Sequence, residues 1–369
     1  MNKVAAVSFG NTKFTQEDIP IEQKLLESTK NLFENTSNLD QKDVDAVLVS
    51  TNDNTKYLGA ILSELSGIHP KISHTVESLC NSGTNTIVSG ISYVAAGLAD
   101  VVLIAGGDRY DSPGQILEWD KARGEFKHPI FWASIFTKAY KRNFGATEED
   151  LAAVSAKNHK NAKDNPNAYS NKEFSIQEVL ESRELTSDLR LYDCSRPCTG
   201  SSAILLTSEK FAKKFTDTPV WITGIGQKTT SAGFTKNSDF TLMESTVESG
   251  KTAFAMAKKN PSVIDVMELH DAFSVCEPLA LEDLGLAQKG KGYKVTKELY
   301  ETENNFVNPR GGLIGSGHPL GATGIAQTNE IVSQLQGKSE KRQVDDAKIG
   351  LVHNMSAAAT SSTVLILES

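Results

Sequence analysis

The most distinctive stretch of this chain is NPRGGLIGSGHPLG, residues 308–321. It holds five glycines and two prolines in fourteen residues, a composition typical of a tight loop whose backbone approaches a ligand closely. Its one histidine, His318, precedes Pro319 at the predicted start of a helix, a position that suits a base or an acid. Because no Gly-Lys-Ser/Thr ending follows, we exclude a nucleotide P-loop. A catalytic loop and a merely structural glycine loop are the two interpretations left.

A cysteine stands at the start of another predicted helix. Cys80 follows the strand-like run Ser73–Val76 and precedes Asn81-Ser82-Gly83-Thr84, which suits the cap and first turn of a helix. Since the positive end of a helix lowers the pKa of a thiol, we expect Cys80 to titrate below its usual value of about 8.5. The alternative is a small buried cysteine at a strand–helix junction.

These two residues lie in a weak internal repeat. Cys80 is followed by an amphipathic helix and by the strand and turn Val101–Gly107. His318 is followed by an amphipathic helix and by the strand and turn Ile349–Asn354. A duplication would place Cys80 and His318 at equivalent helix starts, facing each other across one cleft; chance similarity is the alternative.

Composition restricts the class of protein. The chain has 369 residues, which suggests two fused units, and 39% of them are hydrophobic, as in a soluble globular enzyme. Its net charge of −8 argues against a nucleic-acid partner, although a local basic pocket would still hold an anionic ligand. No apolar run is long enough to span a bilayer, so we expect no membrane association.

The four cysteines point to a reducing, cytoplasmic setting. They are too few for a disulfide framework, and because no Cys-x-x-Cys pair is present we predict no metal site. Cys194 and Cys198 have three residues between them, a poor spacing for a metal or redox pair. We predict that both are ordinary buried thiols.

Short β-branched runs alternate with longer amphipathic ones, which predicts an α/β protein with largely parallel strands. The predicted strands are Val4–Phe9, Ala46–Ser50, Val101–Ala105, Ile204–Thr207, Val220–Ile225, Ile264–Leu269, Ile349–Val352 and Thr363–Leu367. The clearest predicted helices are Ile21–Phe33, Ser82–Leu98, Thr246–Lys258 and Thr323–Leu335. Residues 112–190 have few strand signals, and we interpret them as an inserted helical and loop domain that carries substrate contacts. Residues 1–111 with 191–215 then form the N-terminal half, and residues 216–369 the C-terminal half.

Two further histidines follow strands. His270 comes after the apolar run Ile264–Met267, at the carboxyl end of a strand, where α/β sheets place ligands. His353 lies in the final turn, Val352-His353-Asn354-Met355-Ser356, whose small side chains leave backbone amides accessible. We predict that the other histidines, including His128, are surface or core residues. Together, a thiol and histidines at element ends indicate covalent acyl transfer through a thioester, by a hydrolase, a protease or a carbon–carbon bond-forming enzyme.

The motifs resemble those of the thiolase superfamily, in its sterol-carrier-type and archaeal acetyl-CoA acetyltransferase branch. The resemblance covers essentially the whole chain and rests on Gly-His-Pro-Leu-Gly at 317–321, on His-Asp-Ala-Phe at 270–273 and on Cys80 with Asn-Ser-Gly. Residues 151–168 are similar to the family's loop-domain helix and turn. The resemblance implies a fold of two duplicated βαβαβαββ halves, arranged in five αβαβα layers, with an inserted loop domain.

The resemblance also implies a reaction and its residues. Cys80 would take an acyl group from acetyl-CoA or acetoacetyl-CoA, His318 would accept the thiol proton, and His270 would stabilise an enolate. Substrate contacts are implied for four residues: Gly317, His353, Asn354 and Ser356. No cofactor is implied, because the coenzyme A thioesters are the substrates.

One feature departs from the family pattern. Many thiolases shuttle the α-proton with a second cysteine in a Cys-x-Gly-Gly turn, and the aligned position here is Asn354. The branch's alternative cysteine, in His-Asp-Cys-Phe, is replaced by Ala272. The proton acceptor is therefore open among Cys80, His318, His353 and Cys276. The turn reads Met-Ser-Ala-Ala-Ala, so it is expected to be either stiffer than a glycine-rich turn or different from it in shape.

Two other functions are compatible with the resemblance. One is a 3-ketoacyl-CoA thiolase for longer chains. The other is a weakly active subunit that channels acyl-CoA in a complex with hydroxymethylglutaryl-CoA synthase and a small OB-fold protein. Family resemblance further implies a homodimer or homotetramer.

Overall fold

The computed structural model describes residues 3–114 and 116–369 and contains one large sheet. Its nine strands are hydrogen-bonded in the order β3-β2-β4-β7-β1-β8-β11-β10-β9. They are β1 (Val4–Asn11), β2 (Ala46–Ser50), β3 (Ile72–Val76), β4 (Val101–Asp108), β7 (Gly200–Ser208), β8 (Val220–Thr229), β9 (Val266–Glu268), β10 (Ile349–Ser356) and β11 (Ser361–Glu368). β4 and β10 extend beyond their predicted ends because glycines and polar residues, which no apolar pattern marks, continue them.

The strand order occurs twice, once in each half of the chain. β2-β4-β7-β1 of the N-terminal half corresponds to β9-β10-β11-β8 of the C-terminal half. A parallel bridge between Met267 and Val307 stands where the equivalent of β3 would lie. The halves join where β1 pairs with β8 over only two registered residue pairs. The duplicated α/β fold expected from the sequence is confirmed.

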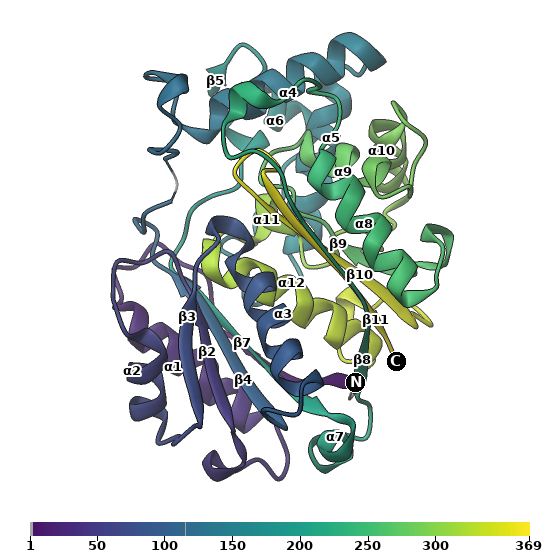
Figure 1. The fold of residues 1–369 in the computed structure, drawn as a ribbon. Coiled ribbons are helices and arrows are strands. Elements are labelled where there is room, and N and C mark those ends of the chain that lie inside the picture. Colours follow the sequence, from purple (N-terminus) through teal and green to yellow (C-terminus); the bar gives the residue numbers. More distant parts are fainter. Residues whose placement is uncertain (1–2, 115) are drawn as a thin grey trace.

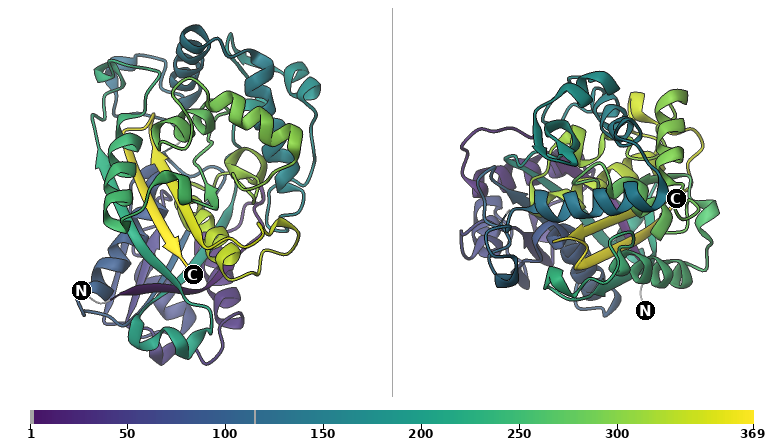
Figure 2. Two further views of the ribbon diagram at one scale, coloured as in Figure 1. Left: turned by 90° about the vertical axis from the view of Figure 1, so that its right-hand side faces the viewer. Right: turned by 90° about the horizontal axis from the view of Figure 1, so that it is seen from above.

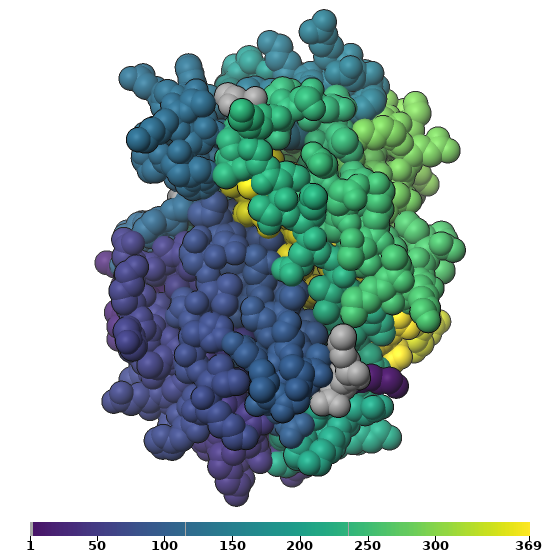
Figure 3. All heavy atoms as spheres, in the orientation of Figure 1, coloured from purple at the N-terminus to yellow at the C-terminus, as the bar shows by residue number. Residues whose placement is uncertain are grey.

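Helices make the remaining layers (Figures 1 and 2). α3 (Ser82–Ala95) and α12 (Leu320–Leu335) pack together in the middle, and α12 contacts both half-sheets. The outer face of the N-terminal half-sheet is covered by α1 (Ile21–Glu34), α2 (Leu58–Ser66) and α7 (Glu209–Phe215). In the C-terminal half-sheet, α8 (Glu244–Ala257) covers the outer face of β8 and β11. In the space-filling view the two halves lie side by side along one face (Figure 3).

The expectation of largely parallel strands is wrong. Among the described strands of the large sheet, only β2 with β3, β2 with β4 and β9 with β10 pair in parallel, and the other strand pairs are antiparallel. Within each half-sheet one strand, β7 or β11, runs opposite to all the other strands of that half. Buried strands are apolar at every position whatever their direction, so the sequence pattern carries no signal for this orientation.

Within residues 112–190, the part that the structure describes (all but residue 115) contains three α-helices and a two-stranded ribbon but no strand of the large sheet. The helices are α4 (Pro129–Phe144), α5 (Glu148–Ala162) and α6 (Ile176–Glu181), and the ribbon pairs β5 (Glu184–Thr186) with β6 (Leu189–Arg190). They lie at one end of the molecule with α9 (Cys276–Asp283), α10 (Gly292–Thr302) and α11 (Gly312–Ser316) of the C-terminal half (Figure 1). None of the described helices combines the length and apolarity needed to cross a membrane.

Candidate active site

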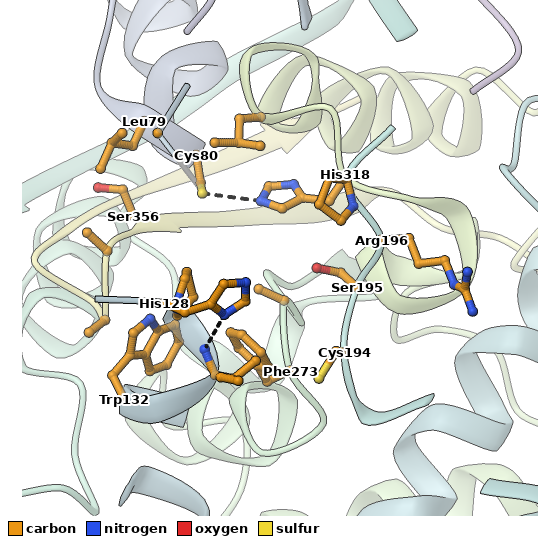
Figure 4. Close-up of a pocket in the computed structure, with 18 of the residues that line it drawn as sticks. Leu79, Cys80, His128, Trp132, Cys194, Ser195, Arg196, Phe273, His318 and Ser356 are labelled. Atoms are coloured by element: carbon orange, nitrogen blue, oxygen red, sulfur yellow. Dashed lines mark hydrogen bonds between the residues drawn. The ribbon is translucent and has the colours of Figure 1, made fainter. Parts of the chain in front are cut away.

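The two equivalent helix starts bring Cys80 and His318 into contact. Cys80 lies in a 3₁₀ turn, Leu79–Asn81, directly before α3, and His318 lies between α11 and α12. Leu79 has φ of 52°, a left-handed conformation rare for leucine, in the turn that presents the thiol. The Cys80 Sγ and His318 Nε2 atoms are 3.2 Å apart (Figure 4). The repeat therefore places both residues across one cleft, as predicted.

A hydroxyl group determines which nitrogen of His318 carries the proton. Thr323 Oγ1 donates to the carbonyl of Pro319 at 2.9 Å, so its oxygen is free to accept a hydrogen bond. It lies 2.7 Å from His318 Nδ1, which therefore holds the proton. The Nε2 lone pair is left facing the thiol of Cys80. Thr323 was not predicted, since its role depends on contact with a ring held in place by the fold.

The predicted low pKa of Cys80 is wrong. Burial, with a smaller contribution from the Asp108 carboxylate, raises the pKa of this thiol to about 12. Burial, aided by the charge of Arg310, lowers the pKa of His318 to about 3, so the imidazole is neutral at physiological pH. The resting pair is thus a thiol beside a neutral base, and the proton has to move to His318 as the sulfur attacks.

His270 faces the same pair from the end of β9. Its ring and that of His318 meet edge to face, with centroids 5.3 Å apart. Asn354 Nδ2 donates both to His270 Nδ1 at 2.9 Å and to Gln327 Oε1 at 2.8 Å. Because Nδ1 accepts, the proton of the neutral imidazole is on Nε2. Burial, with the neighbouring histidines, holds the pKa of His270 well below its ordinary value, so the ring is an uncharged donor.

The four residues predicted to contact substrate lie at different distances from the cavity. Ser356 lines the cavity in front of Cys80 and His318. Asn354 lies behind His270 instead of on the cavity wall. His353 is fully buried on the other face of β10, where its Nε2 lies 3.0 Å from Thr246 Oγ1. Gly317, with φ of 97°, packs against Cys198 and leaves no room for a side chain. Of the four, the structure brings only Ser356 to the cavity.

Cys80, His270 and His318 are also the one group of possible metal ligands that we find in residues 3–114 and 116–369. Their donor atoms all lie within 4.8 Å of one another. A thiol with two imidazoles is a ligand set that suits Zn²⁺. An ion bound there would occupy both the nucleophile and the base.

Two family models match nearly the whole chain. The model "Thiolase, N-terminal domain" covers residues 4–179, and "Thiolase C-terminal domain-like" covers residues 226–369. An acetyl-CoA acetyltransferase of Methanothermobacter thermautotrophicus is 33% identical, over 99% of this chain and 99% of that protein. The chain belongs to the thiolase family. Its activity is thus of the thiolase type, an acyl transfer.

Further comparisons show how broad the family is around this thiolase. The "Benzoylsuccinyl-CoA thiolase subunit BbsB" of Thauera aromatica is 30% identical, with 95% of this chain and 94% of that protein covered. The solved structure "Ltp2-ChsH2(DUF35) aldolase" has a TM-score of 0.87 at 23% identity and covers 100% of this chain and 98% of that one. At that identity the likeness shows the fold alone.

A cavity of about 310 Å³ opens in front of the three residues of this thiolase. Its far wall is apolar and includes Trp132 and Phe273, which lie opposite Cys80 (Figure 4). His128 lines it too, from the cap of α4, where its Nδ1 accepts from the Ile130 N–H at 3.3 Å. His128 is exposed, so the prediction of a surface or core residue is confirmed, and its place at the cavity is an additional contact that was not predicted. No local sequence signal marks it, because α4 and Cys80 meet only in the fold.

The two cysteines predicted as buried thiols differ. Cys198 is 1% exposed, as predicted. Cys194 is only half-buried and lines the cavity, on a segment that bridges to Phe273. Burial raises the pKa of the Cys194 thiol, so it is neutral.

The turn between β10 and β11 forms one side of the cavity, and its backbone is strained. Ala357, Ala358 and Ala359 have φ of 45°, 63° and 59°, in the left-handed region that glycine normally occupies. Each such residue costs about 1–2 kcal/mol. The turn thus keeps a glycine-like backbone shape with alanine at all three positions.

We predict that Ala358→Gly raises the free energy of unfolding by about 0.5–1 kcal/mol, because relief of strain exceeds the entropy that glycine adds to the unfolded chain. Urea denaturation followed by circular dichroism measures the change. The control is Ala60→Gly on the exposed face of α2, which should lower that free energy by about 0.5–1 kcal/mol. A loss of stability in Ala358→Gly would show that the turn is not strained.

Proposed function

We propose that this thiolase condenses two acetyl-CoA to acetoacetyl-CoA, or cleaves acetoacetyl-CoA with CoA, through an acyl group on Cys80. The observation that carries the proposal is the 3.2 Å contact between Cys80 Sγ and the unprotonated Nε2 of His318, beside the His270 donor. The similarity to an archaeal acetyl-CoA acetyltransferase supports the acetyl substrate.

In the first half-reaction the thiol proton of Cys80 passes to His318 Nε2, and the sulfur attacks the carbonyl carbon of acetyl-CoA. The carbon–sulfur bond to CoA breaks, and the CoA thiolate takes the proton from His318. The carbonyl oxygen would be held by backbone N–H groups of Cys80 and Ser356. Such donors act strongly in a cavity from which water is excluded.

In the second half-reaction the α-proton of another acetyl-CoA needs an acceptor. The sulfur of Cys80 is acylated at this stage, His353 lies off the cavity, and Cys276 is 1% exposed in the core. We therefore assign the proton to His318 Nε2, which is free again after CoA leaves. The His270 Nε2–H donates to the enolate oxygen.

The enolate carbon then attacks the acetyl carbon on Cys80. The new carbon–carbon bond forms, the bond to the Cys80 sulfur breaks, and His318 returns its proton to that sulfur. Each half-reaction thus uses one base, and no second active-site thiol is required.

A longer-chain 3-ketoacyl-CoA substrate is the second candidate, and the cavity favours it. A volume of about 310 Å³ with walls such as Trp132, Phe273 and Met355 exceeds what an acetyl group fills, even beside the thiol end of CoA. The related benzoylsuccinyl-CoA thiolase subunit has a name that denotes a bulky acyl group.

We predict that the purified protein consumes acetoacetyl-CoA when CoA is added, measured as loss of the enolate absorbance. Rates with 3-ketoacyl-CoA substrates of increasing length then separate the two candidates. A rate that is highest for acetoacetyl-CoA supports the first, and a rise of about tenfold or more with chain length supports the second. No turnover of any substrate would contradict both.

The third possibility, a weakly active subunit in a complex, is tested by the same assay. The solved "Ltp2-ChsH2(DUF35) aldolase", which has a similar fold, is named with a DUF35 component. Activity that appears only after hydroxymethylglutaryl-CoA synthase or a small OB-fold protein is added would support such a complex, and full activity of the homo-oligomer alone would contradict it.

A further inference from the structure

A buried carboxylate that the proposed reaction does not use lies at the end of β4. Asp108 is the last residue of this strand, is 0% exposed and does not line the catalytic cavity. Burial raises the pKa of Asp108 to about 6, which is still below physiological pH, so the group is ionised. A buried charge is costly unless hydrogen bonds compensate for it, so its partners indicate its role.

Groups from both halves of the chain donate to this carboxylate. Its Oδ1 accepts from Thr51 Oγ1 at 3.0 Å and from the Asn52 N–H at 2.8 Å. Its Oδ2 accepts from Asn52 Nδ2 at 3.0 Å and from the Gly321 N–H at 2.5 Å. Thr51 and Asn52 directly follow β2, whereas Gly321 lies in the first turn of α12. The carboxylate therefore ties the start of α12 to the ends of β2 and β4.

The helix α12 receives its N-terminal cap from the other half of the chain. At its own cap position stands Pro319, which makes no side-chain hydrogen bond to the first turn. The first N–H groups of a helix lack intrahelical acceptors, and a capping Asp normally accepts from the second or third helical residue. Gly321 is the second residue of α12, so Asp108 supplies that acceptor from a distant segment. Its negative charge also suits the positive end of the helix.

The peptide groups of Gly321 are held on both sides. Its N–H donates to Asp108, and its carbonyl accepts from Ser50 Oγ at 2.7 Å. A side chain has no room here, because a Cβ atom on Gly321 would lie 2.6 Å from the Ser50 carbonyl oxygen. The first turn of α12 is thus fixed against the N-terminal half-sheet.

This turn also holds the catalytic base. The Pro319 carbonyl, next to His318, accepts from the N–H of Thr323 at 3.0 Å and from its Oγ1 at 2.9 Å. The same Oγ1 atom accepts the Nδ1 proton of His318 at 2.7 Å. A shift of Gly321 would therefore move the ring of His318. A misplacement of about 1 Å can lower the rate of a catalytic step by about 10²-fold.

The internal repeat shows that the carboxylate is specific to the half that holds the base. Asp108 ends β4, and Ser356 ends the equivalent strand, β10. β4 contacts α12, whose start carries His318, and β10 contacts the turn that carries Cys80. A negative charge favours a protonated imidazole but would repel the oxyanion that forms beside Cys80. Asp in one half and Ser in the other fit these opposite requirements.

We propose that Asp108 is a positioning residue for the catalytic base, whose carboxylate caps α12 across the two halves and holds the His318 ring against Cys80. The proposal rests on the proposed function, in which His318 is the base. Asp108→Asn tests it, because an amide NH₂ would then face either the Asn52 N–H or the Gly321 N–H. The charge at the start of the helix is lost in both orientations.

The first measurement is independent of substrate. With ¹⁵N-labelled histidine in the full chain, NMR should show a protected Nδ1–H signal of His318, identified by its absence in His318→Gln. In Asp108→Asn this proton should exchange with water at least about tenfold faster. The control is Asp53→Asn, which removes a buried carboxylate that binds Arg109 and Thr55 instead of α12. Its exchange rate should stay within about twofold of the wild type.

The second measurement is stopped-flow acetylation of Cys80 by acetyl-CoA. Asp108→Asn should lower the maximal rate by about 10- to 100-fold, because the base is displaced. The acetyl-CoA concentration that gives half of that rate should stay within about twofold, since Asp108 does not line the cavity. Asp53→Asn should change neither quantity by more than about twofold.

A further variant covers the case in which Asp108→Asn fails to fold. Ser50→Ala releases the carbonyl of the same Gly321 peptide and should speed the exchange and slow the acetylation by at least about threefold. No His318 signal in the wild type, unchanged exchange in Asp108→Asn or, failing that variant, in Ser50→Ala, or an equal effect of Asp53→Asn would each overturn the proposal. A wild type that shows the signal but is not acetylated would contradict the proposed function, and the exchange rates would still decide the capping role.

Discussion

Replacing Cys80 by alanine should lower the rate of acetoacetyl-CoA cleavage by roughly 10⁴-fold or more, a loss typical of a removed nucleophile. The reason is geometric: the Cys80 Sγ atom lies in contact with the unprotonated Nε2 of His318. Initial rates measure the loss. Intact-protein mass spectrometry after mixing with acetyl-CoA should show one added acetyl group on the wild type and none on the variant.

The cavity itself offers a matched control for this prediction. Cys194 is a second neutral thiol that lines the cavity, beside Phe273, with its Sγ directed to the Arg190 carbonyl at 3.5 Å. Cys194→Ala should still be acetylated, and the peptide that carries the label should contain Cys80. A label on Cys194, or full activity of Cys80→Ala, would contradict the covalent scheme.

Replacing His270 by alanine should lower kcat for condensation by about 10²–10³-fold, the usual cost of losing an oxyanion donor. Acetylation of Cys80 should survive, because His270 acts on the second substrate. Stopped-flow measurement of each half-reaction separates the two steps. Slow acetylation in this variant would place His270 in the first step and contradict the assignment.

The tautomer of His270 provides a finer test. Asn354→Asp exchanges a donor for a carboxylate at His270 Nδ1, so the ring proton should move to Nδ1 and leave Nε2 without a proton. We expect a loss of condensation close to that of His270→Ala, again with acetylation retained. Replacement of the buried His353, whose ring faces Thr246, should change stability more than the balance between the half-reactions. Full condensation by Asn354→Asp would refute the tautomer argument.

Much of the site followed from local sequence because its residues stand at element junctions. Cys80 and His318 each precede a helix that has glycine and small residues in its first turns, and His270 follows a short apolar strand. Such junctions leave a local trace in glycine, proline and cap residues. Contacts between distant elements leave no such trace. His128 in the cavity, Thr323 behind His318 and Asn354 behind His270 became visible only with the fold.

The predictions of strand direction and of the charge state of the Cys80 thiol were both wrong, because each property depends on contacts across the fold. A run of buried residues looks alike in parallel and antiparallel pairs, so β7 and β11 carried no sign of their orientation. A helix start favours a thiolate in isolation, yet Cys80 is packed beneath the cavity wall near Asp108, and burial outweighs the helix end.

The sequence by itself determined the family and the duplicated α/β plan, and it predicted Cys80 as the nucleophile with two facing histidines, because these depend on motifs within short stretches. Only the tertiary structure decided the protonation of these residues, the size of the cavity and the contacts that Thr323, Asn354 and Gln327 make behind the histidines. It also placed the guanidinium of Arg310, from the opening glycine loop, over the ring of Phe14. Proton positions, cavities and unpaired charges depend on which atoms meet across the fold, and no local pattern records those distances.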